Sequence, residues 1–332
     1  MSLDAGLQRL WYGPAWLSAP LWPLSGLFGL TARLRAVCYA NGLLRSYRVA
    51  APVVIVGNIT VGGTGKTPVA AWLAGELGAL GYRVGVVLRG YGGSHRGEPM
   101  VVTPDSDPSI VGDEAVLHAR KAAHVVITGA DRVAAANLAI QNGAQVVVCD
   151  DGLQHLRLQR DCELAVMDRK RGIGKGWLLP PGPLREPSSR LSRVDAVILT
   201  ERAGAGGRWQ DLFAPMLARA SLRPGVAVNL RNGERRDLAA FRRQSLHAVA
   251  GIGNTDAFFA GLRAAGLSFE AHALPDHATL DAGMLGGLRE APVLMTEKDA
   301  VKYADSAGPQ WWYVELEVEF EPESAKALLE LV

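Results

Sequence analysis

Residues 56–67 read Val56-Gly57-Asn58-Ile59-Thr60-Val61-Gly62-Gly63-Thr64-Gly65-Lys66-Thr67. The run that leads into them, from Val53, is short, apolar and β-branched, which is typical of a buried strand. The residues that follow, Thr67–Leu80, have the composition of a helix. A glycine-rich turn between a strand and a helix can direct several backbone N–H groups at one phosphate. The sequence therefore predicts a phosphate-binding loop (P-loop) here.

The side chains of this loop suit a nucleotide and a divalent cation. The glycines would let the backbone turn its N–H groups toward phosphate oxygens. Lys66 can reach the β- and γ-phosphates, and the Thr67 hydroxyl can bind Mg²⁺. We therefore predict that ATP is bound by Thr60, Val61, Gly62, Gly63, Thr64, Gly65, Lys66 and Thr67. Thr60 stands where the motif usually has its first glycine, and the alternative is a glycine-rich turn without a ligand.

Two acids follow another apolar run, Val146–Cys149. An acid at the end of a buried strand holds Mg²⁺ in many nucleotide sites. Neighbouring residues of an extended chain point to opposite faces, so Asp150 and Asp151 cannot contact one ion equally unless the strand ends there. We predict that Asp150 belongs to the Mg²⁺ shell and that Asp151 reaches the substrate side. The alternative for Asp151 is that it caps the next turn.

From Pro52 onward, short β-branched runs alternate with longer helical stretches. We expect strands at 53–56, 84–88, 125–128, 146–149, 163–167 and 196–200, and helices at 67–80, 114–123 and 132–141. This alternation indicates a parallel sheet covered on both faces, whose ligands bind beyond the carboxyl ends of the strands. The predicted fold class is α/β, a P-loop NTPase (RecA-like) sheet with helices on both faces.

A second alternation begins near Leu246. We expect strands at 248–250, 269–273, 293–295 and 312–318, and helices at 256–265, 280–289 and 323–331. The residues between the two alternations are polar and contain Pro-Gly and Asn-Gly turn signals. The predicted organisation is a P-loop domain at 51–222, a linker at 223–245 and a smaller α/β domain at 246–332.

The first 50 residues differ in character from the rest. They hold five arginines against one acid, a balance of +4, whereas the whole chain carries +2. No charged side chain occurs from Leu10 to Ala32, and three tryptophans lie in this run. Tryptophan near arginine is typical of a membrane–water interface, while the three prolines argue against a straight spanning helix. We predict a membrane-associating helical segment at 1–50; the alternative is a hairpin packed on the protein's own core.

Composition excludes several classes of protein. With 332 residues, of which 48% are hydrophobic, the chain can build two packed domains. Its three cysteines, Cys38, Cys149 and Cys162, have no paired spacing, which argues against a zinc site or a disulfide framework. Outside the first 50 residues the net charge is −2, so we expect no nucleic-acid partner. No motif indicates an obligate protein partner.

Several motifs together resemble the tetraacyldisaccharide 4′-kinase (lipid A 4′-kinase) family. The resemblance rests first on Gly57–Pro68 and on Asp150-Asp151-Gly152-Leu153-Gln154-His155. It extends to Arg89-Gly90-Tyr91-Gly92-Gly93, Gly112-Asp113-Glu114, Leu179-Pro180-Pro181-Gly182-Pro183-Leu184-Arg185-Glu186-Pro187, Pro275-Asp276-His277 and residues 296–302. It therefore covers nearly the whole chain. Pro181 and Leu153 stand where the family usually has alanine and phenylalanine, and neither change removes a chemical group.

The resemblance implies a reaction and its residues. In the family, the γ-phosphoryl group of ATP passes to the 4′-hydroxyl of a tetraacylated disaccharide 1-phosphate, at the cytosolic face of the bacterial inner membrane. The family's catalytic pair is similar to Asp113 and His277, so Asp113 would accept the hydroxyl proton and His277 would orient Asp113 or tune its pKa. Lys66 and Asp151 complete the predicted catalytic set.

The resemblance also implies partners and further contacts. Arg185 and Glu186 would face the site, with Glu186 near the metal, and the substrate candidates are Arg89, Gln154, His155 and Arg185. The expected partners are the lipid A disaccharide precursor and the anionic lipids of the inner membrane. Residues 1–50 would attach there, either lying on the surface or as a single N-terminal anchor.

Other interpretations stay open from the residues alone. Asp113 can be a helix N-cap, and His277 a turn residue. A soluble ATPase of the partitioning or metal-chaperone type has a similar glycine loop, but with a signature lysine where Val61 stands. A GTP-binding switch protein would need a lysine in place of Glu297. Histidines without a spacing signal are expected to be surface or satisfied residues: His95, His118, His124, His247 and His272.

Overall fold

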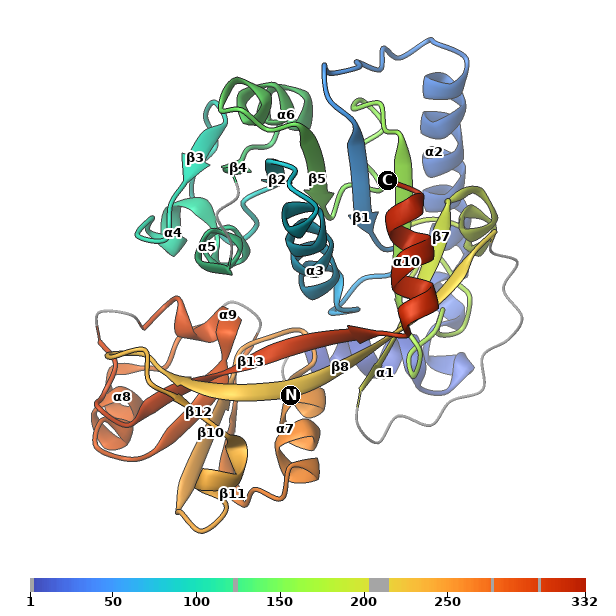
Figure 1. Ribbon diagram of the computed structural model, residues 1–332. Coiled ribbons are helices and arrows are strands. Elements are labelled where there is room, and N and C mark those ends of the chain that lie inside the picture. The colour runs from blue at the N-terminus through green and yellow to red at the C-terminus, as the bar shows by residue number, and fades with distance from the viewer. Residues whose placement is uncertain (1–2, 122–124, 203–214, 276–277, 304–305) are drawn as a thin grey trace.

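A single sheet of 13 strands runs through the chain in the computed structural model, which describes residues 3–121, 125–202, 215–275, 278–303 and 306–332 (Figure 1). The strands are β1 Val53–Gly57, β2 Val84–Leu88, β3 Met100–Val102, β4 Val125–Thr128, β5 Val146–Asp150, β6 Cys162–Asp168, β7 Ala196–Arg202, β8 Leu217–Asn229, β9 Arg235–Arg236, β10 Leu246–Ala250, β11 Phe269–Ala273, β12 Val293–Thr296 and β13 Trp311–Phe320. Their order is β11-β10-β12-β13-β8-β7-β6-β1-β5-β2-β4-β3, with β9 paired to β8. Most neighbours are parallel; β3–β4, β8–β13 and β8–β9 are antiparallel.

Helices cover both faces of the larger, parallel part of the sheet. The helices are α1 Leu3–Tyr12, α2 Trp22–Ala40, α3 Lys66–Ala79, α4 Pro108–Val111, α5 Asp113–Lys121, α6 Arg132–Gln141, α7 Thr255–Ala264, α8 Ala282–Leu288, α9 Glu297–Ala300 and α10 Pro322–Glu330. Buried residues of α3, α5 and α10 pack on the face that Val54 and Val56 present, and those of α6 pack on the face of Val53 and Ile55. The α/β class, with a large and mainly parallel sheet, is confirmed. The elements expected from Pro52 to Arg202 are present within about three residues of their predicted ends.

The expected linker at 223–245 is wrong in its first part. β8 continues through it to Asn229, pairing with β7 on one side and with β13 on the other. Alternate residues Ala218, Ala220 and Leu222 are buried, which is the period-two signal of a strand. The pair Pro224-Gly225 lies where the register between β8 and β13 shifts. It therefore marks an irregularity within the strand and not a turn. How the chain divides into domains stays a prediction.

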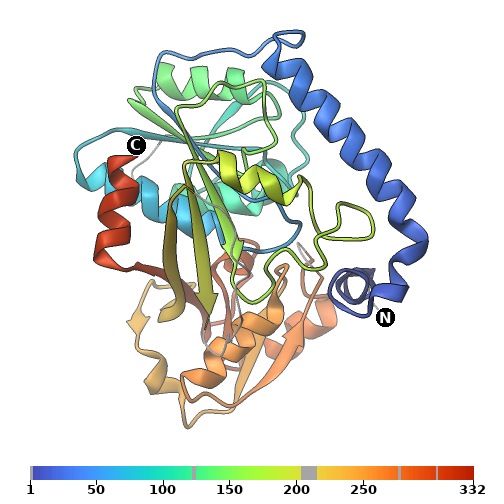
Figure 2. The same cartoon turned by 90° about the vertical axis from the view of Figure 1, so that its right-hand side faces the viewer.

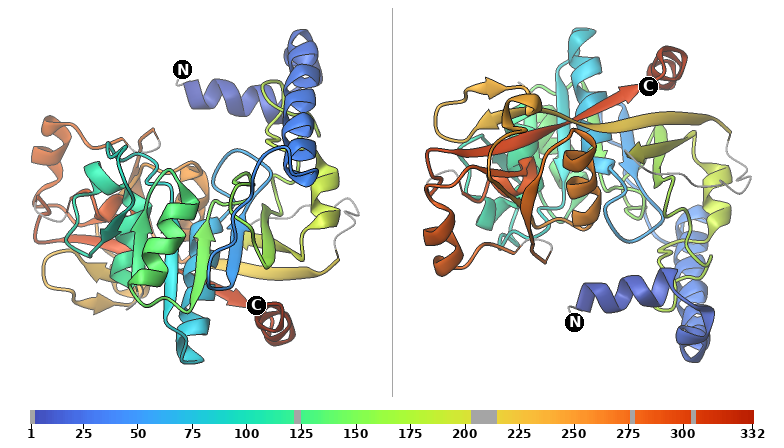
Figure 3. Two further views of the ribbon diagram at one scale, coloured as in Figure 1. Left: turned by 90° about the horizontal axis from the view of Figure 1, so that it is seen from above. Right: turned by 90° about the horizontal axis from the view of Figure 1, so that it is seen from below.

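The N-terminal helices pack against an irregular segment that precedes β7. Trp11 Nε1 donates a hydrogen bond of 2.9 Å to the carbonyl of Pro180, and Ser25 Oγ donates one of 3.1 Å to that of Leu178. The rings of Trp22 and Trp177 stack with centroids 5.0 Å apart. α2 runs along one side of the molecule, and α1 extends from its foot (Figures 2 and 3).

The outer surface of α2 is apolar and uncovered. Only Ser25 and Gly29 of this helix are buried, so most of it does not pack on the protein's own core. Large side chains with 49–60% exposure follow one another at helical spacing: Leu24, Leu27, Leu30, Leu34 and Val37. We call these five residues the leucine stripe. Within the described residues, no helix has both the length and the apolarity needed to cross a membrane.

Candidate active site

The glycine-rich loop lies between β1 and α3, and its shape depends on two left-handed glycines. Gly62 has φ +112° and Gly65 has φ +90°, a region that favours glycine. A Cβ on Gly65 would lie 2.7 Å from Leu222 Cδ1 of β8, so this position also requires the absence of a side chain. Thr200 Oγ1 donates to the carbonyl of Thr64 at 2.8 Å, and the Asn58 amide donates to Thr64 Oγ1 at 3.1 Å. The loop is therefore fixed from β1 and from β7.

The proline-rich segment runs alongside this loop. The N–H of Val61 donates to the carbonyl of Pro183 at 2.8 Å, and the N–H of Arg185 donates to that of Ile59 at 2.7 Å. Because these bonds hold residues 183–185 against the loop, the Arg185 side chain points into the site. The same segment contacts α1 and α2 through residues 177–180.

Asp151 faces the loop because β5 ends one residue before it. Its φ of +57° is the only positive value of a non-glycine residue in the described chain, so the backbone turns there. Its carboxylate lies 3.5 Å from Lys66 Nζ and 3.2 Å from an Arg185 guanidinium nitrogen. Burial would raise the pKa of Asp151, but the two cations outweigh burial and hold that pKa below its usual value.

Asp150 points to the other side and is almost fully buried. Its Oδ2 lies 3.2 Å from His118 Nε2 of α5, a side chain that is also buried. Its Oδ1 has no hydrogen-bond partner among the described residues. His118 was not selected from the sequence, although one signal was present: it is a polar residue on the apolar face of α5, beside Ala115 and Ala119. His118 is thus a buried histidine with a hydrogen-bond partner, within the expectation, but the identity of that partner was not predicted.

A cavity of about 290 Å³ opens next to these acids. It lies at the carboxyl ends of β2 and β5, as ligand sites of parallel sheets do. Its lining includes Arg89, Asp150, Asp151, Gln154 and Arg185, together with Glu114. The structure thus brings together most of the residues predicted for metal and substrate.

Three more predicted residues, Glu186, Thr67 and His155, are not part of the cavity lining. Gln154 donates to Glu186 Oε1 at 2.7 Å and to the carbonyl of Asn58 at 3.0 Å, so Glu186 is held at the rim. Thr67 is the second residue of α3 and is partly buried. His155 does not line the cavity; burial, together with the charges of Arg132 and Arg89, lowers its pKa to about 4.

Asp113 is the first residue of α5 and is buried. Lys302 Nζ lies 3.6 Å from its carboxylate and 2.9 Å from Asp299. Lys302 also donates to the carbonyl of Ala278 at 3.2 Å. These contacts place the acid where the smaller half of the sheet meets the larger. His277 lies outside the described residues.

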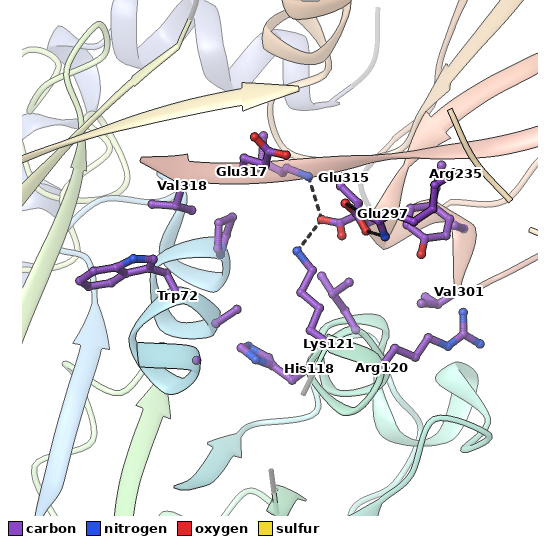
Figure 4. A pocket seen from close by; sticks show the side chains of 17 residues that line it. Trp72, His118, Arg120, Lys121, Arg235, Glu297, Val301, Glu315, Glu317 and Val318 are labelled. Atoms are coloured by element: carbon purple, nitrogen blue, oxygen red, sulfur yellow. Dashed lines mark hydrogen bonds and ion pairs between the residues drawn. The ribbon is translucent and has the colours of Figure 1, made fainter. Parts of the chain in front are cut away.

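A second and larger cavity, of about 570 Å³, lies behind His118 between α3, α5 and β13 (Figure 4). Lys121 reaches across it to Glu297 at 2.8 Å, and the N–H of Leu316 donates to the same carboxylate. Burial raises the pKa of Glu297, against the opposing charge of Lys121. Among the described residues, none of those predicted for the site lines this cavity. We therefore take the smaller cavity and the glycine-rich loop as the candidate active site.

Comparison with known proteins decides the family. The model of a family described as tetraacyldisaccharide-1-P 4′-kinase matches residues 17–332. The chain belongs to this family. The family's tetraacyldisaccharide 4′-kinase from Alkalilimnicola ehrlichii is 47% identical over 315 residues, covering 95% of this chain and 92% of the relative. That from Pasteurella multocida is 42% identical over 326 residues, covering 97% of both chains.

A solved structure of the family has the same fold. LpxK from Aquifex aeolicus, determined in complex with ATP, is similar with a TM-score of 0.79 and 27% sequence identity. The similarity covers 95% of this chain and 98% of that one. The resemblance inferred from the sequence motifs is confirmed.

Proposed function

We propose that this chain is a tetraacyldisaccharide 4′-kinase, which transfers the γ-phosphoryl group of ATP to the 4′-hydroxyl of a tetraacylated disaccharide 1-phosphate. The observation that carries the proposal is the meeting of Lys66, Asp151 and Arg185 beside the glycine-rich loop. Relatives similar over almost the full length bear this name, which identifies the acceptor.

The glycine-rich loop would act as a P-loop of a RecA-like NTPase sheet. Its N–H groups and the start of α3 form a cradle for phosphate oxygens, as helix N-termini do. Lys66 would neutralise the charge that develops on the γ-phosphoryl group during transfer. Asp151 pairs with Lys66 and Arg185, and these ion pairs position both cations at the loop.

The acids beside the loop fit a Mg²⁺ ion. Asp150 Oδ1 is buried without a partner among the described residues, and a buried carboxylate oxygen in that state suits a cation. Asp150 and Thr67 would hold the ion, with Glu186 at the rim. Bound there, Mg²⁺ neutralises charge on the phosphate oxygens.

Asp113 would accept the proton of the 4′-hydroxyl. A sugar hydroxyl is a weak nucleophile, and a carboxylate within hydrogen-bond reach removes its proton as the new bond to phosphorus forms. The ion pair with Lys302 positions this carboxylate from the smaller half of the sheet. The role of His277 as its partner stays a prediction.

The protein would work at the cytosolic face of the bacterial inner membrane. A substrate with four acyl chains stays in the bilayer, because each buried methylene contributes about 0.8 kcal/mol. The leucine stripe would enter the headgroup region, and Arg33, Arg35 and Arg45, all exposed, would meet anionic lipids. The sugar could then be phosphorylated without extraction of the lipid.

The deciding assay is phosphoryl transfer from labelled ATP to a tetraacyldisaccharide 1-phosphate in detergent. We expect label at the 4′-position only when ATP, Mg²⁺ and the lipid acceptor are all present. The predicted alternative, a soluble partitioning or metal-chaperone ATPase, would instead release inorganic phosphate and leave the lipid unlabelled.

A further inference from the structure

Three side chains with metal-binding atoms converge at the outer edge of the smaller half of the sheet. His247 lies on β10, and Glu270 and His272 lie on β11, the edge strand (Figure 1). Residues two apart on a strand share a face, so Glu270 and His272 project on the same side. In the parallel pairing His247 stands opposite Glu270, which brings the third side chain to them.

The distances between the ligand atoms are those of a metal site. His247 Nδ1 and His272 Nε2 lie 3.1 Å apart, and His247 Nδ1 is 3.5 Å from Glu270 Oε2. His272 Nε2 is 3.9 Å from the other oxygen of Glu270. Two nitrogens bound to a tetrahedral Zn²⁺ at about 2.0–2.1 Å would be roughly 3.3 Å apart. The observed spacing requires only a small adjustment of the exposed glutamate.

We propose that His247, Glu270 and His272 form a zinc site. Two imidazoles and one carboxylate offer the nitrogen and oxygen donors that Zn²⁺ prefers, and water would complete its tetrahedron. In the metal-free protein, one nitrogen donates a proton to the other across 3.1 Å. On binding, the donor imidazole would carry its proton on its other ring nitrogen, so that both facing nitrogens offer a lone pair to the metal and both rings stay neutral.

The proposed zinc site is separate from the candidate active site, and bound zinc would stabilise the edge of the sheet. Zinc would fasten β11, which pairs with one strand among the described residues, to β10. β10 continues into Gly251, whose N–H donates to Asp299 at 2.8 Å. Bound zinc therefore stabilises the smaller half of the sheet and its turn at Gly251, and it takes no part in phosphoryl transfer.

Metal titration of the full-length, untagged protein, first treated with a chelator, tests the proposal. Co²⁺ serves as the spectroscopic probe, and we expect the visible bands of a tetrahedral complex at one Co²⁺ per chain, lost when Zn²⁺ is added. Zn²⁺ at about 100-fold above its Kd should raise Tm by about 5 °C. Kinase activity measured with Mg²⁺ should stay the same with and without zinc.

Variants assign the signal to these residues. His247→Ala with His272→Ala should abolish the tetrahedral bands, and Glu270→Gln, at an exposed position that does not threaten folding, should weaken Co²⁺ binding at least tenfold. His95→Ala removes a half-buried histidine elsewhere and should change neither. Unchanged bands in Glu270→Gln and in the double variant would place the metal elsewhere, and absence of tetrahedral bands in the wild type would overturn the proposal.

Discussion

The proposed phosphoryl transfer depends on individual charged side chains at the glycine-rich loop. Lys66 is the first of these to test. Lys66→Ala removes the cation that faces the transferred group, so kcat should fall by at least about 10²–10³-fold. Lys326→Ala removes a lysine that is 80% exposed on α10 and should leave kcat unchanged. Steady-state kinetics with the lipid acceptor measures both. Turnover near the wild-type value in Lys66→Ala would remove this residue from the mechanism.

Asp113 should affect the acceptor hydroxyl and not the nucleotide. Asp113→Asn keeps the shape of the side chain but cannot take a proton, so kcat should fall about 10²–10⁴-fold while the affinity for ATP changes little. Asp105→Asn alters an exposed acid before α4 and serves as the control. If Asp113 and His277 act as one unit, the double variant with His277→Ala will lose less than the two single losses combined. Loss of ATP binding in Asp113→Asn would instead indicate a structural residue.

His155 should make stability depend on pH. Its pKa is about 4 in the folded protein, below the value of 6.5 expected when it is unfolded. Between these values the unfolded chain binds a proton that the folded chain does not, so stability falls as pH decreases from about 6.5 to 4. His155→Gln should flatten this part of the profile. Urea unfolding at pH 7.5 and pH 5 gives the comparison, and an equal loss in both proteins would contradict it.

At the scale of elements, the sequence predicted strands and helices well because their signals are local. Buried parallel strands are often β-branched runs, and β2, which is one of these, was expected at its observed bounds. β8 was not predicted, and beyond Leu222 its Pro-Gly pair has the same local sequence as a turn. Only its pairing with β13 shows that the strand continues, and pairing between distant segments has no local signal.

The sequence predicted those residues of the candidate site that belong to recognisable motifs. Lys66, Asp150, Asp151 and Arg185 were selected in advance, and the structure brings them together. The contact of His118 with Asp150 was not predicted, because it depends on how α5 lies on β5. The same is true of His247 and His272, which are 25 residues apart and meet only through strand register.

At the scale of the molecule, ion pairs connect the two halves of the sheet near the site. Lys298 of α9 lies 3.3 Å from Glu114 of α5, and Lys302 pairs with Asp113 in the same region. Both lysines belong to residues 296–302, a segment that carries part of the family resemblance. α5 thus carries the proposed base, the partner of Asp150 and the contacts to the smaller half.

The leucine stripe faces away from the sheet. From its position we predict how the molecule would bind to a bilayer. The proline-rich segment contacts α1 and α2 at residues 177–180 and the glycine-rich loop at residues 183–185. A membrane-bound α2 would therefore hold the active site at a fixed distance from the headgroups. Changes in the stripe should weaken membrane binding without altering the site itself.

Leu27→Ser with Leu34→Ser removes two exposed side chains of the stripe. Each should contribute on the order of 1 kcal/mol when buried among lipids, so binding to anionic vesicles should weaken on the order of 30-fold. Leu80→Ser changes a leucine that is 63% exposed on another surface and should leave vesicle binding intact. Replacing Arg33, Arg35 and Arg45 by glutamine should reduce the salt dependence of binding, because fewer charges then meet the headgroups. ATP affinity in solution should be equal in all these variants. Vesicle sedimentation measures the binding, and equal sedimentation of the wild type and the stripe variant would show that α2 does not enter the membrane.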